Sequence, residues 1–395
     1  MKTAAAARQR RLKLQTSYGQ AMIHARGYSV PETAVAFAHA RELAPGIADF
    51  AERFSVYYGL WAGSFVHGEA AATREITDVM LREVATRPGS LEACTAHRLN
   101  GNAHWLAGDF AAARVELERA LALFDVERDG DLVVRFAQDV GVAAKAYLAL
   151  TLWPMGEVEH AQRVTDEALA RAQRIGHAGT AAYVRSHCAT LEMIRGNPAA
   201  VAAHAEALLD ISGAHEMPMF AAYGAVNAAW ARARMGGGDA AIAEMRAAIE
   251  MCRQRGIGLN MPILTTVLAE AEALAGDMNA GLETIELALA ATERQGERWF
   301  AAETNRIRGE ILLKRDLGDT APAEEAYRTA IAIAQQQKAQ SFELRAAVSL
   351  ARLWRDEGKP RQARELLAPV YGWFTEGLDT PDLKEAQALL DELHA

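Results

Sequence analysis

The chain repeats a short pattern of small residues along its length. Gly108 is followed five positions later by Ala113 and, after seven more, by Ala120. The same spacing recurs at Gly156 (Ala161, Ala168), Gly236 (Ala241, Ala248), Gly276 (Gly281, Ala288), Gly318 (Ala323, Ala330) and Gly358 (Ala363). Because residues seven apart lie on one face of an α-helix, each pair predicts a helix that packs closely against the helix preceding the glycine.

The turn glycines are themselves regularly spaced, which predicts one helix hairpin for about every 40 residues. They stand at positions 27, 68, 108, 156, 196, 236, 276, 318 and 358. A single hairpin cannot bury its apolar face, so its neighbours must stack against it. We therefore predict an all-α, right-handed superhelical solenoid of about nine hairpins. The alternative, a compact bundle of antiparallel helices, gives no reason for the constant register.

The hairpins are predicted to form one array over residues 1–395. Residues 1–48 form an N-terminal hairpin, residues 49–376 the stacked repeats and residues 377–395 a C-terminal capping helix that begins with Thr380 as N-cap and Pro381. One longer spacing marks an insertion near residues 125–138, which is either a loop over the concave face or a connection with an apolar plug. The best strand candidate, residues 132–134, lies in it. The basic residues 1–14 are interpreted as part of the first helix rather than a transit peptide.

One repeat matches a known motif closely. Gly101, His104, Gly108, Phe110, Ala113 and Ala120 fall where the tetratricopeptide motif places its glycines, aromatic residues and alanines. The chain therefore resembles tetratricopeptide solenoids, although its repeat of about 40 residues exceeds the usual 34 or so.

A second resemblance concerns three longer blocks, at residues 138–153, 341–354 and 367–384. They resemble the C-terminal helical region of bacterial signalling proteins that carry a class III adenylate-cyclase-like domain and an AAA-type ATPase. Val140 stands where that family usually has proline. The family's P-loop is absent, since Gly358-Lys359 is followed by Pro360 and Leu353 replaces the first glycine. The resemblance implies a regulatory module, either a stand-alone protein or a fragment of a larger one.

Composition narrows the class of protein further. Hydrophobic residues make up 51% of the chain, charged residues 24%, and the formal net charge is -9. These values exclude wholesale disorder and disfavour a general nucleic-acid binder. No apolar stretch is long enough to predict a membrane span, and three scattered cysteines predict no disulfide framework. We therefore expect a cytoplasmic protein.

Candidate chemistry is sparse. Cys94, His97 and His104 share one helix face at spacings that could suit zinc or haem, but the two histidines occupy the inward-packing aromatic positions of the repeat. No nucleophile motif, carboxylate dyad or dinucleotide fingerprint is present. The sequence therefore predicts no catalytic residue, no metal and no cofactor.

The first helix of each hairpin is expected to line the concave face. Its groove-facing positions are Arg98, Asn102, Trp105, Tyr183, Ser186, Tyr223, Trp230, Thr266, Glu270, Glu303, Arg306, Glu310, Arg345 and Arg352. Aromatic, asparagine and arginine side chains suit the capture of a protein or peptide segment, which is the predicted partner. The alternative is a small-molecule sensor with an aromatic pocket near Trp105, Tyr183, Tyr223 and Trp230, covered by residues 125–138. A structural role stays open for the charged end, because Arg306 stands at helical ion-pair spacing from Glu303 and Glu310.

Overall fold

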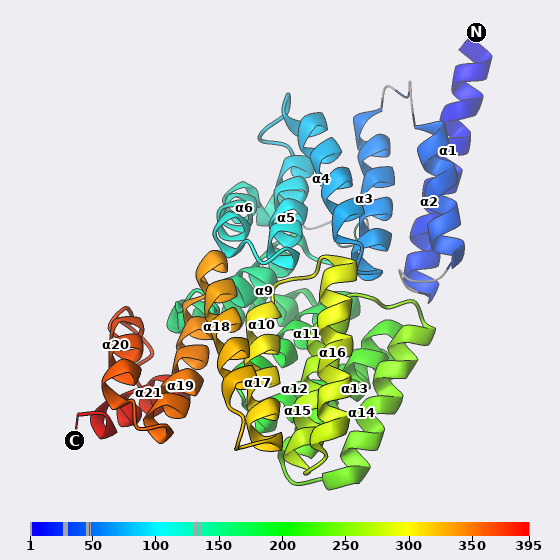
Figure 1. The fold of residues 1–395 in the computed structure, drawn as a ribbon. Helices are drawn as coiled ribbons and strands as arrows, with labels where there is room; N and C mark the ends of the chain where they lie inside the picture. The colour runs from blue at the N-terminus through cyan, green and yellow to red at the C-terminus, as the bar shows by residue number, and fades with distance from the viewer. Residues whose placement is uncertain are drawn as a thin grey trace. The chain divides into compact units, whose positions relative to one another are not determined.

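The computed structural model describes residues 2–26, 31–44, 47, 49–129, 133, 136 and 138–394, and this part of the chain contains helices and no strand. The first helix of each hairpin, here called an A helix, is α3 (Phe50–Val66), α5 (Leu91–Leu106), α9 (Val140–Leu152), α11 (Ala178–Ile194), α13 (Pro218–Arg234), α15 (Met261–Leu274), α17 (Ala301–Arg315) or α19 (Gln340–Asp356). The second, here called a B helix, is α4 (Ala70–Val84), α6 (Phe110–Leu123), α10 (Val158–Ile175), α12 (Pro198–Ala214), α14 (Gly238–Gln254), α16 (Met278–Gln295), α18 (Ala321–Gln337) or α20 (Pro360–Tyr371). The predicted all-helical class is confirmed (Figure 1).

The remaining helices lie before, within and after this series. Helices α1 (Lys2–Arg26) and α2 (Pro31–Leu43) pack together as a first pair. The Arg8 guanidinium on α1 donates to the carbonyls of Leu43 (3.0 Å) and Glu42 (3.1 Å), so this basic residue has a structural role. The short α7 (Val126–Asp129) lies in the predicted insertion, and α21 (Pro381–Glu392) packs against α19 and α20.

The small residues on the B helices are buried, as predicted. Every alanine of the pattern, from Ala113 to Ala363, is almost fully buried. Gly281 shows why the position must be small, because a Cβ there would lie 3.0 Å from the carbonyl oxygen of Ala269 on the preceding A helix. Close backbone approach between the two helices of a hairpin therefore depends on these residues.

The turn glycines confirm the register of the hairpins with one exception. Glycines 68, 108, 156, 196, 236, 276 and 358 have a positive φ, while Gly27 lies outside the described residues. At Gly318 an aspartate makes the turn instead, since the Asp316 carboxylate accepts from the backbone N–H groups of Gly318 (2.9 Å) and Asp319 (3.3 Å). A second series follows the B helices, with left-handed residues at Gly176, Glu216, Gly256, Gly296 and Lys338. This series could not be recognised from the glycine spacing, because two of its members are Glu216 and Lys338.

The chain divides into two compact units, which are described separately. Unit 1 comprises Met1–Ala103, Val115–Tyr147 and Thr165–Met261, and unit 2 comprises His104–Arg114, Leu148–Val164 and Pro262–Ala395. The predicted division of the chain into residues 1–48, 49–376 and 377–395 stays a prediction.

Both units contain backbone hydrogen bonds between hairpins that are far apart in sequence. In unit 1 the carbonyl of Val66, at the end of α3, accepts from the N–H groups of Gly258 and Leu259 (both 2.9 Å), just before α15. A Cβ at Gly258 would lie only 1.9 Å from the carbonyl oxygen of His67, so this approach requires glycine. In unit 2 the end of α5 is joined in the same way to the start of α17, and the end of α9 to the start of α19. Each hairpin in these contacts thus meets the one five places further along.

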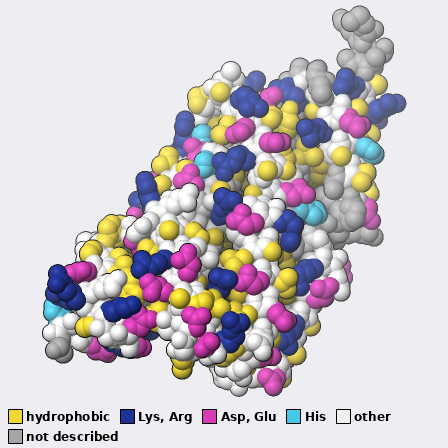
Figure 2. Space-filling model, viewed as in Figure 1, with side chains coloured by type: hydrophobic (Ala, Val, Ile, Leu, Met, Phe, Trp, Pro, Cys, Tyr) yellow, Lys and Arg dark blue, Asp and Glu magenta, His cyan; other side chains and the backbone are white. Residues whose placement is uncertain are grey.

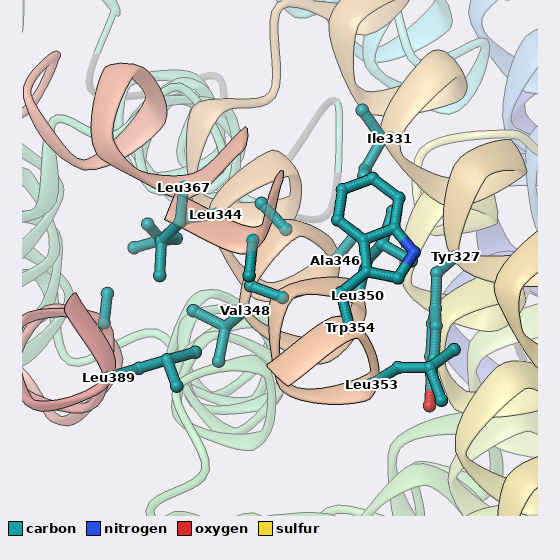
Figure 3. Packing of buried hydrophobic residues seen from close by; sticks show 14 of the residues in the cluster. Tyr327, Ile331, Leu344, Ala346, Val348, Leu350, Leu353, Trp354, Leu367 and Leu389 are labelled. Carbon is teal, nitrogen blue, oxygen red and sulfur yellow. The ribbon is translucent and has the colours of Figure 1, made fainter. Parts of the chain in front are cut away.

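A large apolar cluster fills the end of unit 2. Trp354, Leu350 and Leu353 of α19 pack with Tyr327 and Ile331 of α18 (Figure 3). Leucines of α20 and α21 complete the cluster, so α21 covers the last hairpin as a capping helix should. Thr380 does precede this helix in an extended conformation, but its side chain makes no capping hydrogen bond.

The insertion near residues 125–138 lies partly outside the described residues, including most of the strand candidate at 132–134. Phe136 is described and is buried in unit 1, where its ring lies 4.5 Å from that of Tyr58. Its carbonyl accepts a 2.9 Å hydrogen bond from the Tyr58 hydroxyl. These contacts favour the interpretation of the insertion as a connection with an apolar plug.

Candidate functional site

The predicted groove residues separate into two groups, one in each unit. Unit 1 contains Arg98 and Asn102 on α5, Tyr183 and Ser186 on α11, and Tyr223 and Trp230 on α13. Unit 2 contains Trp105, Thr266, Glu270, Glu303, Arg306, Glu310, Arg345 and Arg352. Most of these side chains are buried or half-buried.

The unit 1 group is centred on the guanidinium of Arg98, which is 0% exposed. None of its three nitrogens has a hydrogen-bond partner in the protein. Its Cζ lies 5.9 Å from the ring centroid of Trp61 on α3, at the outer limit of a cation–π contact. Burying a charge without a partner is expensive, so this arginine is the most unusual group in the described part of the chain.

Two neighbouring side chains share this lack of partners. The Nε1–H of Trp61 and both polar atoms of the Asn102 amide are buried without a hydrogen bond of normal geometry. The Asn102 amide does lie close enough to the Tyr183 hydroxyl for a weak hydrogen bond, which lowers the pKa of Tyr183 against the larger effect of burial. Three donor-bearing residues on α3 and α5 are therefore unsatisfied in one region of unit 1.

Aromatic rings line the same region. The His187 ring stacks on Tyr183, with centroids 4.2 Å apart, and meets the edge of Tyr147 at 4.8 Å. Its Nδ1 lies 2.7 Å from the Tyr183 carbonyl. Burial lowers the pKa of His187 to about 4, and the nearby charge of Arg98 acts in the same direction. The imidazole is therefore neutral at pH 7, and burial likewise raises the pKa of Tyr183.

Other predicted residues of unit 1 have structural partners. The Tyr223 hydroxyl donates to the Leu259 carbonyl at 3.0 Å. Trp230 is buried with the guanidinium of Arg234 6.0 Å from its ring. Ser186 is buried, and its carbonyl accepts from the Thr190 hydroxyl.

The unit 2 group forms an ion network in which each charged side chain has a partner of opposite charge, although Glu303 Oε2 and Arg306 Nε have no hydrogen-bond partner. The buried Glu303 carboxylate accepts from Arg306 at 2.7 Å and from Arg345 at 3.4 Å. Burial alone would raise the pKa of Glu303, but the two guanidinium charges lower it below its usual value. The structural interpretation of the Arg306 spacing is thus the observed one.

The network extends to residues that sequence reasoning missed. Arg345 also contacts Asp382 of α21 at 2.9 Å, and its guanidinium lies 4.9 Å from the ring of Trp153. The Ser349 hydroxyl donates to Glu310 at 2.6 Å, and Glu270 raises the pKa of Arg306 through its charge. The signal that could have identified these partners is the presence of acidic residues at groove-facing positions of one hairpin and of arginines at the same positions of the next.

The other predicted residues of unit 2 have partners outside this network. Trp105 is buried with its ring 4.5 Å from that of Trp299, and its groove-lining role stays a prediction. The Thr266 hydroxyl pairs with that of Thr304 at 2.9 Å. Arg352 is exposed and pairs with Glu385.

The residues considered for metal binding have separate partners. Cys94 donates to the Ala120 carbonyl, His97 contacts Glu116 at 2.6 Å, and His104 lies 3.3 Å from Asp109. Among the residues described, no group of three or more His, Cys, Asp or Glu side chains could hold a metal ion.

Sequence reasoning also missed Tyr58, Trp61, Tyr147 and His187. Their signal lies in helical spacing, because Tyr58 and Trp61 are three apart on α3, and Tyr183 and His187 are four apart on α11. Such pairs share a helix face. On the face seen in Figure 2, basic and acidic side chains are interspersed among hydrophobic ones. No described helix is long and apolar enough to cross a membrane.

Comparison with known proteins defines the class of fold. No protein-family model matches the chain. An uncharacterized protein of Rhizobium meliloti is 25% identical over 239 residues, which is 60% of this chain and 23% of that protein, so the chain spans about a quarter of its relative's length.

Solved structures extend the likeness to the whole chain. A Rap protein complexed with Competence and Sporulation Factor has a TM-score of 0.58 at 10% identity, covering 97% of this chain and 99% of that one. The Cut9–Hcn1 hetero-tetramer of APC/C has a TM-score of 0.50 at 13% identity, covering 91% and 59%. The protein has a tetratricopeptide-like helical repeat fold.

Proposed function

We propose that this chain is a non-catalytic regulatory module that binds a protein or peptide segment along its A helices in a bacterial signalling context. The observation that carries the proposal is the row of polar and aromatic side chains at corresponding positions of successive A helices. Each buried polar group costs free energy unless it is paired, so the unpaired groups at these positions in unit 1 support a binding role.

The fold supplies the mechanism. Rigid A helices hold their side chains in place before binding, so little conformational entropy is lost when a partner docks. The Rap protein of similar fold was solved with a bound factor, which supports binding by this class of fold. Its bacterial relative is about four times longer than the matched segment, which supports a role beside further domains, such as an ATPase or cyclase.

Site-specific photo-crosslinking in source cells tests the proposal. A benzophenone amino acid replaces Arg352, an exposed residue of A helix α19, and in a matched control it replaces Arg361, an exposed residue of B helix α20. We expect a protein crosslink at position 352 and none at position 361, identified by mass spectrometry. Crosslinks at position 361 alone, or equal crosslinks at both, contradict docking on the A helices.

A second candidate function, small-molecule sensing, is favoured by the complete burial of Arg98. An open peptide-binding groove leaves its polar groups accessible to water, whereas this guanidinium is enclosed by aromatic residues. Tryptophan fluorescence during titration with a metabolite panel tests this function, because Trp61 lies beside Arg98. Unchanged fluorescence with every compound would count against it.

A further inference from the structure

The unsatisfied groups of Arg98, Trp61 and Asn102 are mostly hydrogen-bond donors. Arg98 carries five N–H groups, Trp61 one and the Asn102 amide two, and none of them has a partner of normal geometry in the protein. The Asn102 carbonyl oxygen is the one acceptor among these three side chains. Unpaired donors from two A helices, α3 and α5, are therefore gathered in one region of unit 1.

Arg171, elsewhere in unit 1, shows that this fold does pair a half-buried guanidinium. Arg171 donates two hydrogen bonds to the buried Asp139, at 2.9 and 2.6 Å. Asp139 also caps helix α9 by accepting from the Val142 N–H at 2.7 Å. Arg98 is buried more deeply than Arg171 and has no such carboxylate. Its missing counter-charge is thus particular to this site.

The chemistry of the site selects its ligand. We infer that Arg98, Asn102 and Trp61 form a binding site for a carboxylate group, carried by a small organic acid. A carboxylate presents two oxygens in the plane that a guanidinium fork matches, and it leaves further lone pairs for the amide and indole N–H groups. The surrounding rings of Tyr147 and Tyr183 suit the apolar body of such an acid.

The charge of Arg98 favours a carboxylate over a phosphate as the ligand of this site. Among the groups that act on Tyr183 and His187, Arg98 is the one cation, because His187 is neutral at pH 7. One buried positive charge balances one negative charge, whereas a phosphate dianion would leave a net charge in an apolar region. The inference deepens the sensing function and rests on it, but does not depend on a protein partner.

The test is the thermal stability of the purified chain with matched compounds at millimolar concentration. Benzoate and butyrate are expected to raise the melting temperature, while neutral benzamide and inorganic phosphate are not. A ligand that binds only the folded state stabilises it according to its concentration and affinity. An acidic peptide with a free C-terminus, compared with its amide, shows whether the carboxylate can also come from a peptide.

Variants connect binding to the site. Arg98→Met is expected to abolish the response to carboxylates, and Arg98→Lys, which keeps the charge but loses the fork, to weaken affinity about tenfold or more. Arg361→Met, on the exposed face of B helix α20, serves as the matched control and keeps the response. Circular dichroism spectra establish that each variant is folded.

Several outcomes would overturn the inference. They are equal responses in the wild type and Arg98→Met, a stronger response to phosphate than to carboxylates, and no response to any carboxylate. Small molecules that bind without dependence on Arg98 would leave the sensing function in place but refute the carboxylate site. A response confined to free C-termini and lost in Arg98→Met would keep the carboxylate assignment and identify a peptide as its source.

Discussion

Arginines on the A helices of the two units differ in whether the chain supplies them with acidic partners. In unit 2, Arg306 and Arg345 share Glu303, and each has a further acidic partner, Glu310 and Asp382 respectively. In unit 1, Arg98 is fully buried and has none. The comparison teaches that charge on the A-helix face serves stability where it is neutralised within the chain, and indicates a ligand where it is not.

The cost of burial explains why the difference matters. Removing one partner from a buried ion pair leaves an uncompensated charge and destabilises a protein strongly, whereas replacing a buried charge by an apolar side chain is often neutral or stabilising. The two units therefore respond to substitution with opposite signs. The following predictions test this contrast, in decreasing order of expected effect.

Glu303→Ala is expected to have the largest effect, a loss of about 3–5 kcal/mol in the free energy of unfolding, because Arg306 and Arg345 lose their shared counter-charge. Urea denaturation followed by circular dichroism measures it. Glu303→Gln, which keeps the size and one acceptor, should lie between the alanine variant and the wild type. A loss below about 1 kcal/mol for the alanine variant would refute the structural role.

Acid should destabilise unit 1 before unit 2. The folded-state pKa of His187 is about 4 against an ordinary value of 6.5, so between these values the unfolded chain binds a proton that the folded chain does not. Stability is therefore expected to fall as the pH drops from 6.5 to 4, by roughly 3 kcal/mol from this residue. The lowered pKa of Glu303 keeps that carboxylate ionised across most of the same range.

Urea denaturation at several pH values, for the wild type and His187→Phe, measures this dependence. The variant should lose part of the slope between pH 6.5 and 4 and keep the rest, because the pKa of His204 is also lowered to about 4, mainly by burial. Identical slopes would show that His187 is not buried in its neutral form.

Arg98→Met should stabilise the ligand-free chain by about 2 kcal/mol, opposite in sign to Glu303→Ala, because an unpaired charge is replaced by an apolar side chain of similar length. The weak contact with Trp61 offsets only part of the gain. Differential scanning calorimetry without added carboxylate measures the change. A lower melting temperature would show that Arg98 contributes to stability as it stands.

Arg361→Ala, on B helix α20, should have the smallest effect, within about 0.5 kcal/mol. Arg361 is 92% exposed and forms a pair with Glu365 one turn further along the helix. Water and salt screen such pairs. Urea denaturation measures the change in the free energy of unfolding. A loss above this value would mean that exposed ion pairs also contribute to the difference between the two units.

Sequence reasoning identified the positions on A helices but not the roles of their side chains. The spacing of Glu303, Arg306 and Glu310 on one helix indicated the ion pairs within α17, because both partners lie on one element. Asp382 and Ser349 belong to other helices, and no helical spacing connects them to α17. Trp105 occupies a position expected to line the groove, yet the hydrogen bond that joins Leu106 to Arg298 accompanies its burial against Trp299.

The sequence by itself determined the helices, the hairpins and their register. Small residues seven apart and left-handed turn glycines act within a single hairpin, so their physical requirements are visible in consecutive residues. They set the close packing of a B helix on its A helix in the hairpins that carry the pattern, and they recur about every 40 residues.

Only the tertiary structure decided which hairpins meet and which charges remain unpaired. The contact between Val66 and Gly258 joins residues 192 positions apart, and nothing in the spacing of either segment specifies the other. The isolation of Arg98 is likewise a property of every side chain around it, drawn from α3, α5, α9 and α11. Whether a buried charge has a partner depends on all the helices packed against it. The spacing of residues along the sequence describes only one helix at a time.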